Sequence, residues 1–356
     1  MRDSKKAITV TLIFIVLVII ISAIPVGANI FYNSDRILRD ELAGSIDYVV
    51  IGASHGLCAF VPEIIDEQLD CCSYNLCGSL ITFNGRKALI EEEIERNSIK
   101  TLVIELSYNT FVRETYDNEG NMYVVPRLSG LKSKLKYGFE NLKFDGIDWV
   151  YSSYLLSGLQ KCARFSYLLY KNADNIGNVI DIYVDDANDD QSKAYKGFMA
   201  RTVDNATIDS GSVKGEYNSV SINRNYNQEN IEVLDDIVSM AKEKNIEVIF
   251  AVTPLADAEI WRNDNWDDFY SDIKGICEAY ECPLFDFNLM KSRYALLSDD
   301  VSFWGNSHLC KAGAEVFTAE YCRIMNKYNS GEDITEEFYN SYDEMKADSP
   351  YWNYMN

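Results

Sequence analysis

A serine in a turn flanked by glycines is the first group in this chain that could do chemistry. The motif Gly52-Ala53-Ser54-His55-Gly56 directly follows a short apolar run that ends at Ile51. A strand that delivers a serine into such a turn can expose the hydroxyl and direct the serine N–H toward an oxyanion, as in a nucleophile. A serine that caps the next helix fits the same motif. The turn alone therefore leaves both interpretations open.

The two histidines of the chain are His55, within that turn, and His308, near the C-terminus. His308 comes shortly before the last predicted helix, so it could reach over the first turn as a general base for Ser54. This long-range pairing favours catalysis over a purely structural role for His308. His55 is poorly placed to be the base of its own neighbour, and we expect it to face the substrate.

Short apolar runs alternate with amphipathic stretches from residue 47 onward, which is typical of a parallel sheet covered by helices on both faces. Functional groups of such sheets collect at the carboxyl ends of the strands, where Ser54 would lie. The predicted strands are Tyr48–Ile51, Ser73–Leu76, Leu102–Leu106, Val248–Val252 and Leu284–Phe287. Helical periodicity predicts helices over Leu80–Arg96, Glu229–Lys244, Trp266–Tyr280 and Ala312–Asn326. The fold class predicted is therefore α/β.

Two further segments interrupt or follow this pattern. Residues 112–227 are rich in Tyr, Asn and Asp, with one plausible helix over 149–170 and an acidic loop over 181–190. We interpret them as an insertion over one end of the sheet, although a second domain is an alternative. The tail over 330–356 is acidic and aromatic. It either packs on the body or frames an interaction surface.

An uncharged run over residues 7–28 follows Arg2, Lys5 and Lys6. At ~1.5 Å per residue this run can cross a ~30 Å hydrocarbon core. Basic residues before the span predict a cytoplasmic N-terminus and an external main domain. We therefore expect residues 1–29 to be a cytoplasmic stub with a single-pass signal anchor in the cell membrane, and residues 30–356 to be an extracytoplasmic domain. A cleaved signal peptide is the alternative.

Composition excludes some classes of function. Lys and Arg number 33 against 55 Asp and Glu, a net charge of −22, which argues against a nucleic-acid binder because such proteins need a basic face. The nine cysteines include no pair of CxxC elements, and with two histidines a structural zinc site is not expected. We expect mostly free thiols, at most one disulfide, and neither a metal nor another cofactor.

Four short motifs together resemble the SGNH, or GDSL-like, hydrolase superfamily. They are Gly52-Ala53-Ser54, Tyr74-Asn75-Leu76-Cys77-Gly78, Val252-Thr253-Pro254-Leu255, and His308-Leu309 with Gly313, Ala314 and Phe317. The segment Leu106–Phe111 and the single anchor are similar to the membrane-anchored envelope branch typified by DltD proteins. The resemblance implies a three-layer α/β/α sandwich with a flavodoxin-like, five-stranded parallel sheet.

The same resemblance implies roles for individual residues. Ser54 would be the nucleophile and His308 its base, with the N–H groups of Ser54 and Gly78 as oxyanion donors. Asn75 or Asn109 would add a side-chain donor, although each is as well explained as a turn or cap residue.

One departure from the family affects catalysis. The family carries an aspartate three residues before the histidine, where this chain has Gly305. Loss of that carboxylate costs roughly 10⁴ in turnover in a well-studied triad. Three alternatives remain: Asp300 or Asp299 reaches back to His308, Asn306 orients the ring weakly, or the site is inactive.

The sequence therefore predicts an exported, membrane-anchored serine esterase or O-acyltransferase. It would move an acyl group, acetyl by preference, on an envelope glycan or teichoic-type polymer through a Ser54 acyl-enzyme. The resemblance implies a multi-pass membrane O-acyltransferase as partner. The alternative is an inactive accessory or glycan-binding subunit of such a system.

Overall fold

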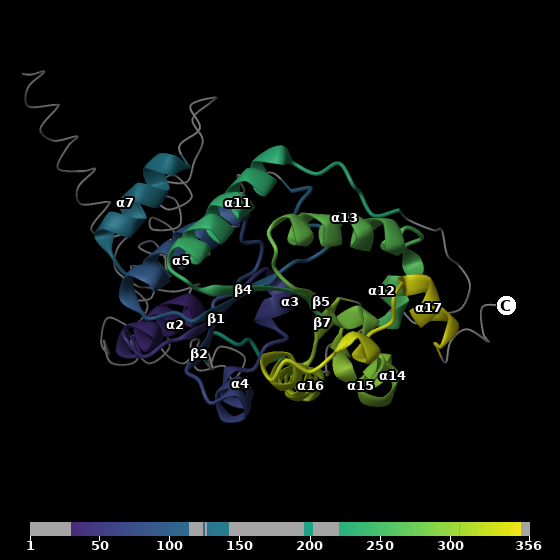
Figure 1. Cartoon of the computed structure of the whole chain (residues 1–356). Helices are drawn as coiled ribbons and strands as arrows, with labels where there is room; N and C mark the ends of the chain where they lie inside the picture. The colour runs from purple at the N-terminus through teal and green to yellow at the C-terminus, as the bar shows by residue number, and fades with distance from the viewer. Residues whose placement is uncertain are drawn as a thin grey trace, which may run out of the picture.

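The computed structural model describes residues 30–113, 124, 127–141, 196–201, 221–305 and 307–349. Figure 1 shows a central sheet with helices on both sides and the N-terminal helix α2 (Ile30–Glu41) at one end of the body. No helix in these ranges is long and apolar enough to cross a membrane. The anchor predicted over residues 7–28 lies outside them, as do the predicted helix over 149–170 and the acidic loop over 181–190.

The five predicted strands form one parallel sheet, so the predicted α/β class is confirmed. Their bounds are Tyr48–Ile51 (β1), Ser73–Asn75 (β2), Thr101–Glu105 (β3), Glu247–Val252 (β4) and Leu284–Asp286 (β5). The order β2-β1-β3-β4-β5 is that of flavodoxin-like sheets. The register pairs Ile51 with Ile104, so the next residue of each strand, Gly52 and Glu105, meet at the carboxyl edge.

Side chains on the two faces of the sheet belong to two separate apolar cores, which makes three layers. Val49 and Ile51 face one core, while Tyr48 and Val50 face the other. Figure 1 shows helices of the first core above the sheet and α4 and α16 below it. The first set is α5 (Phe83–Arg96), α11 (Gln228–Glu243) and α13 (Trp266–Ala279), and the second is α4 (Pro62–Leu69) and α16 (Lys311–Asn329).

The main predicted helices are present, with one start that differs. Leu80 was predicted to begin a helix, but it adopts a left-handed φ of 56°, which a helix cannot contain. The helix α5 begins at Phe83 instead, after Thr82, whose side chain accepts a hydrogen bond from the Gly85 N–H. Asn227 caps α11 in the same way through the Glu229 N–H.

Several shorter elements were not predicted. They are α3 (Ser54–Leu57), α7 (Leu131–Glu140), α12 (Asp257–Arg262), α14 (Arg293–Leu296), α15 (Asp299–Ser302), α17 (Tyr342–Ala347), the 3₁₀ turns Phe287–Leu289 and Thr335–Glu337, and a hairpin of β6 (Phe303–Trp304) and β7 (His308–Leu309). Helix α7 lies in the predicted insertion. The hairpin and α3 hold the two candidate catalytic side chains.

Helix α2 joins the body through buried charges. Asp35 accepts a hydrogen bond from Nε of Arg127 at 2.8 Å, and both side chains are fully buried. Arg127 Nη1 donates to the carbonyls of Leu76 and Cys77, at 3.0 and 2.9 Å. Arg39 of α2 donates to the Arg127 carbonyl. The N-terminal helix is thus connected to the loop that follows β2.

The tail packs on the body as far as it is described. Tyr342 of α17 stacks on Trp266, with ring centroids 5.1 Å apart, and donates to Asp286 Oδ2 at 2.7 Å. Of the two alternatives for this segment, the described part adopts the first. The eight described cysteines are free thiols, and Cys162 lies outside the described residues.

Candidate active site

Ser54 is the first residue of α3, directly beyond the carboxyl end of β1. The N-cap position belongs to Ala53, and no side chain caps this helix, so the interpretation of Ser54 as a helix cap is wrong. Its backbone N–H, in the first turn, has no intrahelical acceptor. The turn therefore presents a half-buried hydroxyl together with an available N–H.

His308 reaches Ser54 from the β6–β7 hairpin. Its Nε2 lies 2.9 Å from Ser54 Oγ, across 254 residues of sequence. That distance is within hydrogen-bond range, and it is the separation expected between a nucleophile and its base. The structure thus brings together the two residues that the sequence singled out.

The second ring nitrogen of His308 contacts a hydroxyl rather than a carboxylate. Ser307 Oγ lies 3.0 Å from His308 Nδ1. When Nε2 accepts the Ser54 proton, Nδ1 carries the ring's other hydrogen, and Ser307 Oγ is its acceptor. Sequence reasoning missed Ser307, because the search was for a carboxylate.

Gly305, at the position of the family's aspartate, forms the turn of the hairpin. Its φ is +65°, in the left-handed region, and a Cβ there would meet nothing within 4 Å. The glycine therefore supplies conformational freedom rather than space. An L-residue at 305 would be strained in this turn.

Neither candidate aspartate takes over the missing role, and we correct that prediction. Asp299 accepts hydrogen bonds from the N–H groups of Asp257 and Ala258, at 2.9 and 3.2 Å, and so holds the start of α12. Asp300 is exposed and forms no hydrogen bond with another described residue. Asn306 lies outside the described residues.

The predicted oxyanion donors also differ from expectation. The N–H of Gly78 donates to the Gly52 carbonyl at 3.1 Å and is therefore occupied. Asn75 is fully buried, and its Nδ2 donates to the carbonyls of Gly56 and Phe60, both at 2.9 Å. Both predictions are corrected, because these groups hold the turn around α3 in place. Asn109 is half-buried and forms no hydrogen bond within the described part of the chain.

His55 lies beside His308 and is almost fully buried, with 7% of its surface exposed. The ring centroids of the two histidines are 4.8 Å apart. His55 Nδ1 lies 2.9 Å from Ser107 Oγ, which donates to Glu105 Oε1 at 2.6 Å. The second oxygen of Glu105 accepts from the Ala53 N–H at 2.8 Å. Sequence reasoning missed Glu105 and Ser107, although a charged residue at the end of an apolar strand was a signal.

Both imidazoles are neutral at neutral pH. Burial lowers the pKa of His308 to about 3, and the positive groups His55 and Arg201 lower it further. Burial likewise lowers the pKa of His55 to about 4, with a smaller contribution from Arg113. A neutral His308 can accept a proton from Ser54, which is the state that a general base requires.

Arg201 and Trp304 form one wall of the site. The Arg201 guanidinium lies 4.7 Å from the centroid of the Trp304 ring, which packs edge-on against His308 at 5.8 Å. Arg201 forms no ion pair with the described residues. Its positive charge therefore acts on His308 without a nearby acid to offset it.

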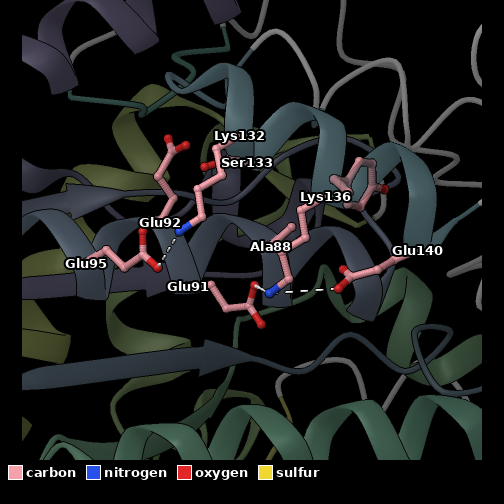
Figure 2. Close-up of a pocket in the computed structure, with 9 residues that line it drawn as sticks. Ala88, Glu91, Glu92, Glu95, Lys132, Ser133, Lys136 and Glu140 are labelled. Atoms are coloured by element: carbon pink, nitrogen blue, oxygen red, sulfur yellow. Dashed lines mark hydrogen bonds and ion pairs between the residues drawn. The ribbon is translucent and has the colours of Figure 1, made fainter.

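A pocket elsewhere, drawn in Figure 2, lies between α5 and α7. Its lysines are already paired: Lys136 contacts Glu91 at 2.5 Å and Glu140 at 3.8 Å, and Lys132 contacts Glu95 at 3.8 Å. None of the candidate site residues lines this pocket. Among the residues that the structure describes, no three His, Cys, Asp or Glu side chains are grouped to hold a metal ion.

Comparison with known proteins gives a distant likeness. No family model matches the sequence, and no curated protein matches it. One solved structure that does align is that of a "putative acylhydrolase" from Bacteroides fragilis NCTC 9343, with 10% sequence identity and a TM-score of 0.37. The alignment covers 82% of this chain and 94% of the other. A similarity this low carries no information about the chemistry of the present site.

Proposed function

We propose that this chain is a serine esterase or O-acyltransferase that forms an acyl-enzyme on Ser54. The observation that supports the proposal is the 2.9 Å contact between Ser54 Oγ and His308 Nε2 at the carboxyl edge of the sheet. A nucleophile next to a neutral base is the arrangement that acyl transfer requires.

In the first half of the reaction, Ser54 Oγ attacks the carbonyl carbon of an ester while its proton moves to His308 Nε2. The carbonyl oxygen becomes an oxyanion, and the Ser54 N–H at the start of α3 can donate to it. The bond to the leaving alcohol then breaks, and the alcohol takes the proton from His308. Ser54 is left acylated and His308 neutral.

In the second half, an acceptor O–H gives its proton to His308 and its oxygen attacks the acyl carbon. The bond to Ser54 breaks, and Ser54 Oγ recovers the proton. Water as acceptor makes the protein an esterase, and a sugar hydroxyl makes it an acyltransferase. The sequence resemblance favours an acetyl group and an envelope glycan or teichoic-type acceptor.

We further propose that residues 7–28 anchor the chain in the cell membrane, with the catalytic domain outside. The uncharged run after Arg2, Lys5 and Lys6 supports this placement. A multi-pass membrane O-acyltransferase that supplies the acyl group would be the partner, as the DltD-like resemblance implies. Recovery of the full chain in carbonate-washed membranes, and its loss when residues 1–29 are deleted, tests the anchor.

A second candidate function is an accessory subunit that binds glycan without catalysis. The observation that favours it is the hydroxyl of Ser307, rather than a carboxylate, at His308 Nδ1. A hydroxyl stabilises an imidazolium less than a carboxylate does, so acyl-enzyme formation would be slow.

The deciding experiment is labelling of the full chain in detergent with a serine-directed fluorophosphonate. We expect stoichiometric labelling of the wild-type protein at Ser54, located by peptide mass spectrometry. Ser54→Ala should abolish labelling and His308→Ala should slow it by a factor of ~10³ or more. Ser330→Ala, at an exposed serine far along the chain, is the matched control and should label like the wild type.

Labelled protein supports the enzyme, and the acceptor is then identified from the fate of p-nitrophenyl acetate. Release of acetate alone indicates a hydrolase, whereas acetylated oligosaccharide in the presence of added sugar indicates a transferase. Folded wild-type protein that does not react with the fluorophosphonate would favour the accessory function.

A further inference from the structure

Glu105 is a fully buried carboxylate beneath the candidate nucleophile, and the mechanism above does not use it. It is the last residue of β3, and the register of β3 against β1 places it beside Gly52. Its Oε2 accepts from the Ala53 N–H at 2.8 Å, and its Oε1 accepts from Ser107 Oγ at 2.6 Å. One carboxylate therefore contacts both the turn of Ser54 and the partner of His55.

The glycines of the Gly52-Ala53-Ser54-His55-Gly56 motif make room for this carboxylate. A Cβ at residue 52 would lie 2.5 Å from both Cβ and Oε2 of Glu105. A Cβ at residue 56 would lie 3.2 Å from Cγ of Glu105 and 2.6 Å from Sγ of Cys77. Distances below 3.0 Å do not occur between such atoms, so the motif admits Glu105 only because both positions lack a side chain.

We propose that Glu105 is a positioning residue of this site: one of its oxygens holds the turn that presents Ser54, and the other fixes the tautomer of His55 through Ser107. This inference rests on the proposed function, in which Ser54 is the nucleophile. Glu105 touches neither substrate nor the reacting atoms and acts through Ala53 and Ser107.

The hydrogen-bond directions follow from counting protons. Glu105 accepts two hydrogen bonds, and the guanidinium of the buried Arg86 from α5 lies close enough to donate to its backbone carbonyl at 2.9 Å, so the carboxylate is ionised. The single proton of Ser107 then points to Glu105. Ser107 Oγ accepts from His55, which therefore carries its hydrogen on Nδ1 and a lone pair on Nε2.

The arrangement gives both imidazoles the same device. A hydroxyl accepts from Nδ1 of each ring: Ser307 for His308 and Ser107 for His55. The negative charge of Glu105 lies behind Ser107, on the His55 side, and the two rings are 4.8 Å apart. An imidazolium formed at His308 during acylation is thus next to a neutral ring backed by a carboxylate. No proton has to pass through Ser107 for this effect.

Nitrogen-15 NMR of the full chain in detergent tests the inference directly. The sequence contains only two histidines, so their ring-nitrogen signals can be assigned with His55→Asn and His308→Asn. We expect His55 in the wild-type protein as the Nδ1–H tautomer. Ser107→Ala removes the acceptor, and the His55 signals should move toward the Nε2–H form that free imidazole prefers.

Glu105→Gln makes the sharpest prediction. The amide oxygen can keep the bond from the Ala53 N–H, which leaves the NH₂ group facing Ser107. Ser107 must then accept from the amide and donate its own proton to His55 Nδ1, so His55 should switch to the Nε2–H tautomer. Glu63→Gln, at an exposed position on α4, is the matched control and should leave both histidines unchanged.

Fluorophosphonate labelling of the same variants gives the functional readout. Ser107→Ala should label at least about tenfold more slowly than the wild type, and Glu105→Gln slower still, with circular dichroism spectra like the wild type. An Nε2–H tautomer of His55 in the wild-type protein, or an unchanged tautomer in both variants, would overturn the inference. Failure of the proposed function looks different: the wild-type protein would not label, whatever the tautomer of His55.

Discussion

Ser307 Oγ lies 3.0 Å from Nδ1 of its sequence neighbour His308, on the side of the ring opposite Ser54. Both residues belong to the C-terminal arm of a hairpin whose turn contains Gly305 at a φ of +65°. The orientation of the candidate base is therefore set from within the same short hairpin rather than by a distant carboxylate.

Ser307→Ala should slow fluorophosphonate labelling by about tenfold without unfolding the protein. The substitution leaves the His308 Nδ1–H without its acceptor, and a hydrogen bond of this kind contributes about 1 kcal/mol. Second-order labelling rates for the variant and for Ser330→Ala measure the effect. Equal rates for the two variants would mean that Ser307 does not orient His308.

The labelling rate should be nearly independent of pH between about 5 and 8. Burial lowers the pKa of His308 to about 3, so the ring stays neutral across this range, whereas an ordinary histidine would protonate and lose activity below about 6.5. A rate profile measured on the free enzyme tests this. A fall in rate centred near pH 6.5 would contradict the buried, neutral base.

Arg201→Gln should move the acidic limb of that profile to higher pH. The positive charge of Arg201 disfavours the protonated ring and so contributes to the low pKa of His308. Removal of the charge raises that pKa, and the rate then begins to fall at a higher pH than in the wild type. Lys311→Gln, at an exposed lysine at the start of α16, serves as the charge-matched control.

Two glycine-to-alanine substitutions should have opposite effects on stability. At Gly52 a Cβ would lie 2.5 Å from Glu105, so Gly52→Ala should destabilise the fold and stop labelling. At Gly275, on the exposed side of α13, a Cβ would meet nothing within 4 Å. Gly275→Ala should therefore stabilise the protein by roughly 0.5–1 kcal/mol through helix propensity. Urea unfolding of the two variants compares them.

Asp35→Asn should destabilise the protein by roughly 3–5 kcal/mol, because it leaves the buried Arg127 charge without its partner. Asp40→Asn, at a half-exposed position on the same helix, is the control and should cost about 1 kcal/mol or less. The free energy of unfolding in urea measures both. A small loss at Asp35 would show that α2 is not an integral part of the fold.

The sheet could be predicted closely because parallel strands buried on both faces are apolar throughout, and all five lie within a residue of the expected bounds. Helix starts were less predictable. Local geometry decided them, as at Leu80, whose left-handed backbone delays α5 until after Thr82. The short elements around the site carry too few residues for any periodicity to show.

Ser54 and His308 could be found because turns after strands are few and the chain has two histidines. Their hydrogen-bond partners could not. Ser307 replaces a carboxylate at a place where no carboxylate stands in the sequence, and Asp299 is already occupied by two N–H groups of α12. Gly78 and Asn75 have the right residue types, but their donors are used within the loop.

The link from Asp35 through Arg127 to the carbonyls of Leu76 and Cys77 has a consequence for where catalysis can happen. Helix α2 begins at residue 30, directly after the proposed anchor, and it is held to the loop beside the site by buried charges. A domain attached in this way stands on a stiff support instead of a loose tether. The height of Ser54 above the membrane is then a fixed dimension of the molecule, so donor and acceptor groups must come to that height to react.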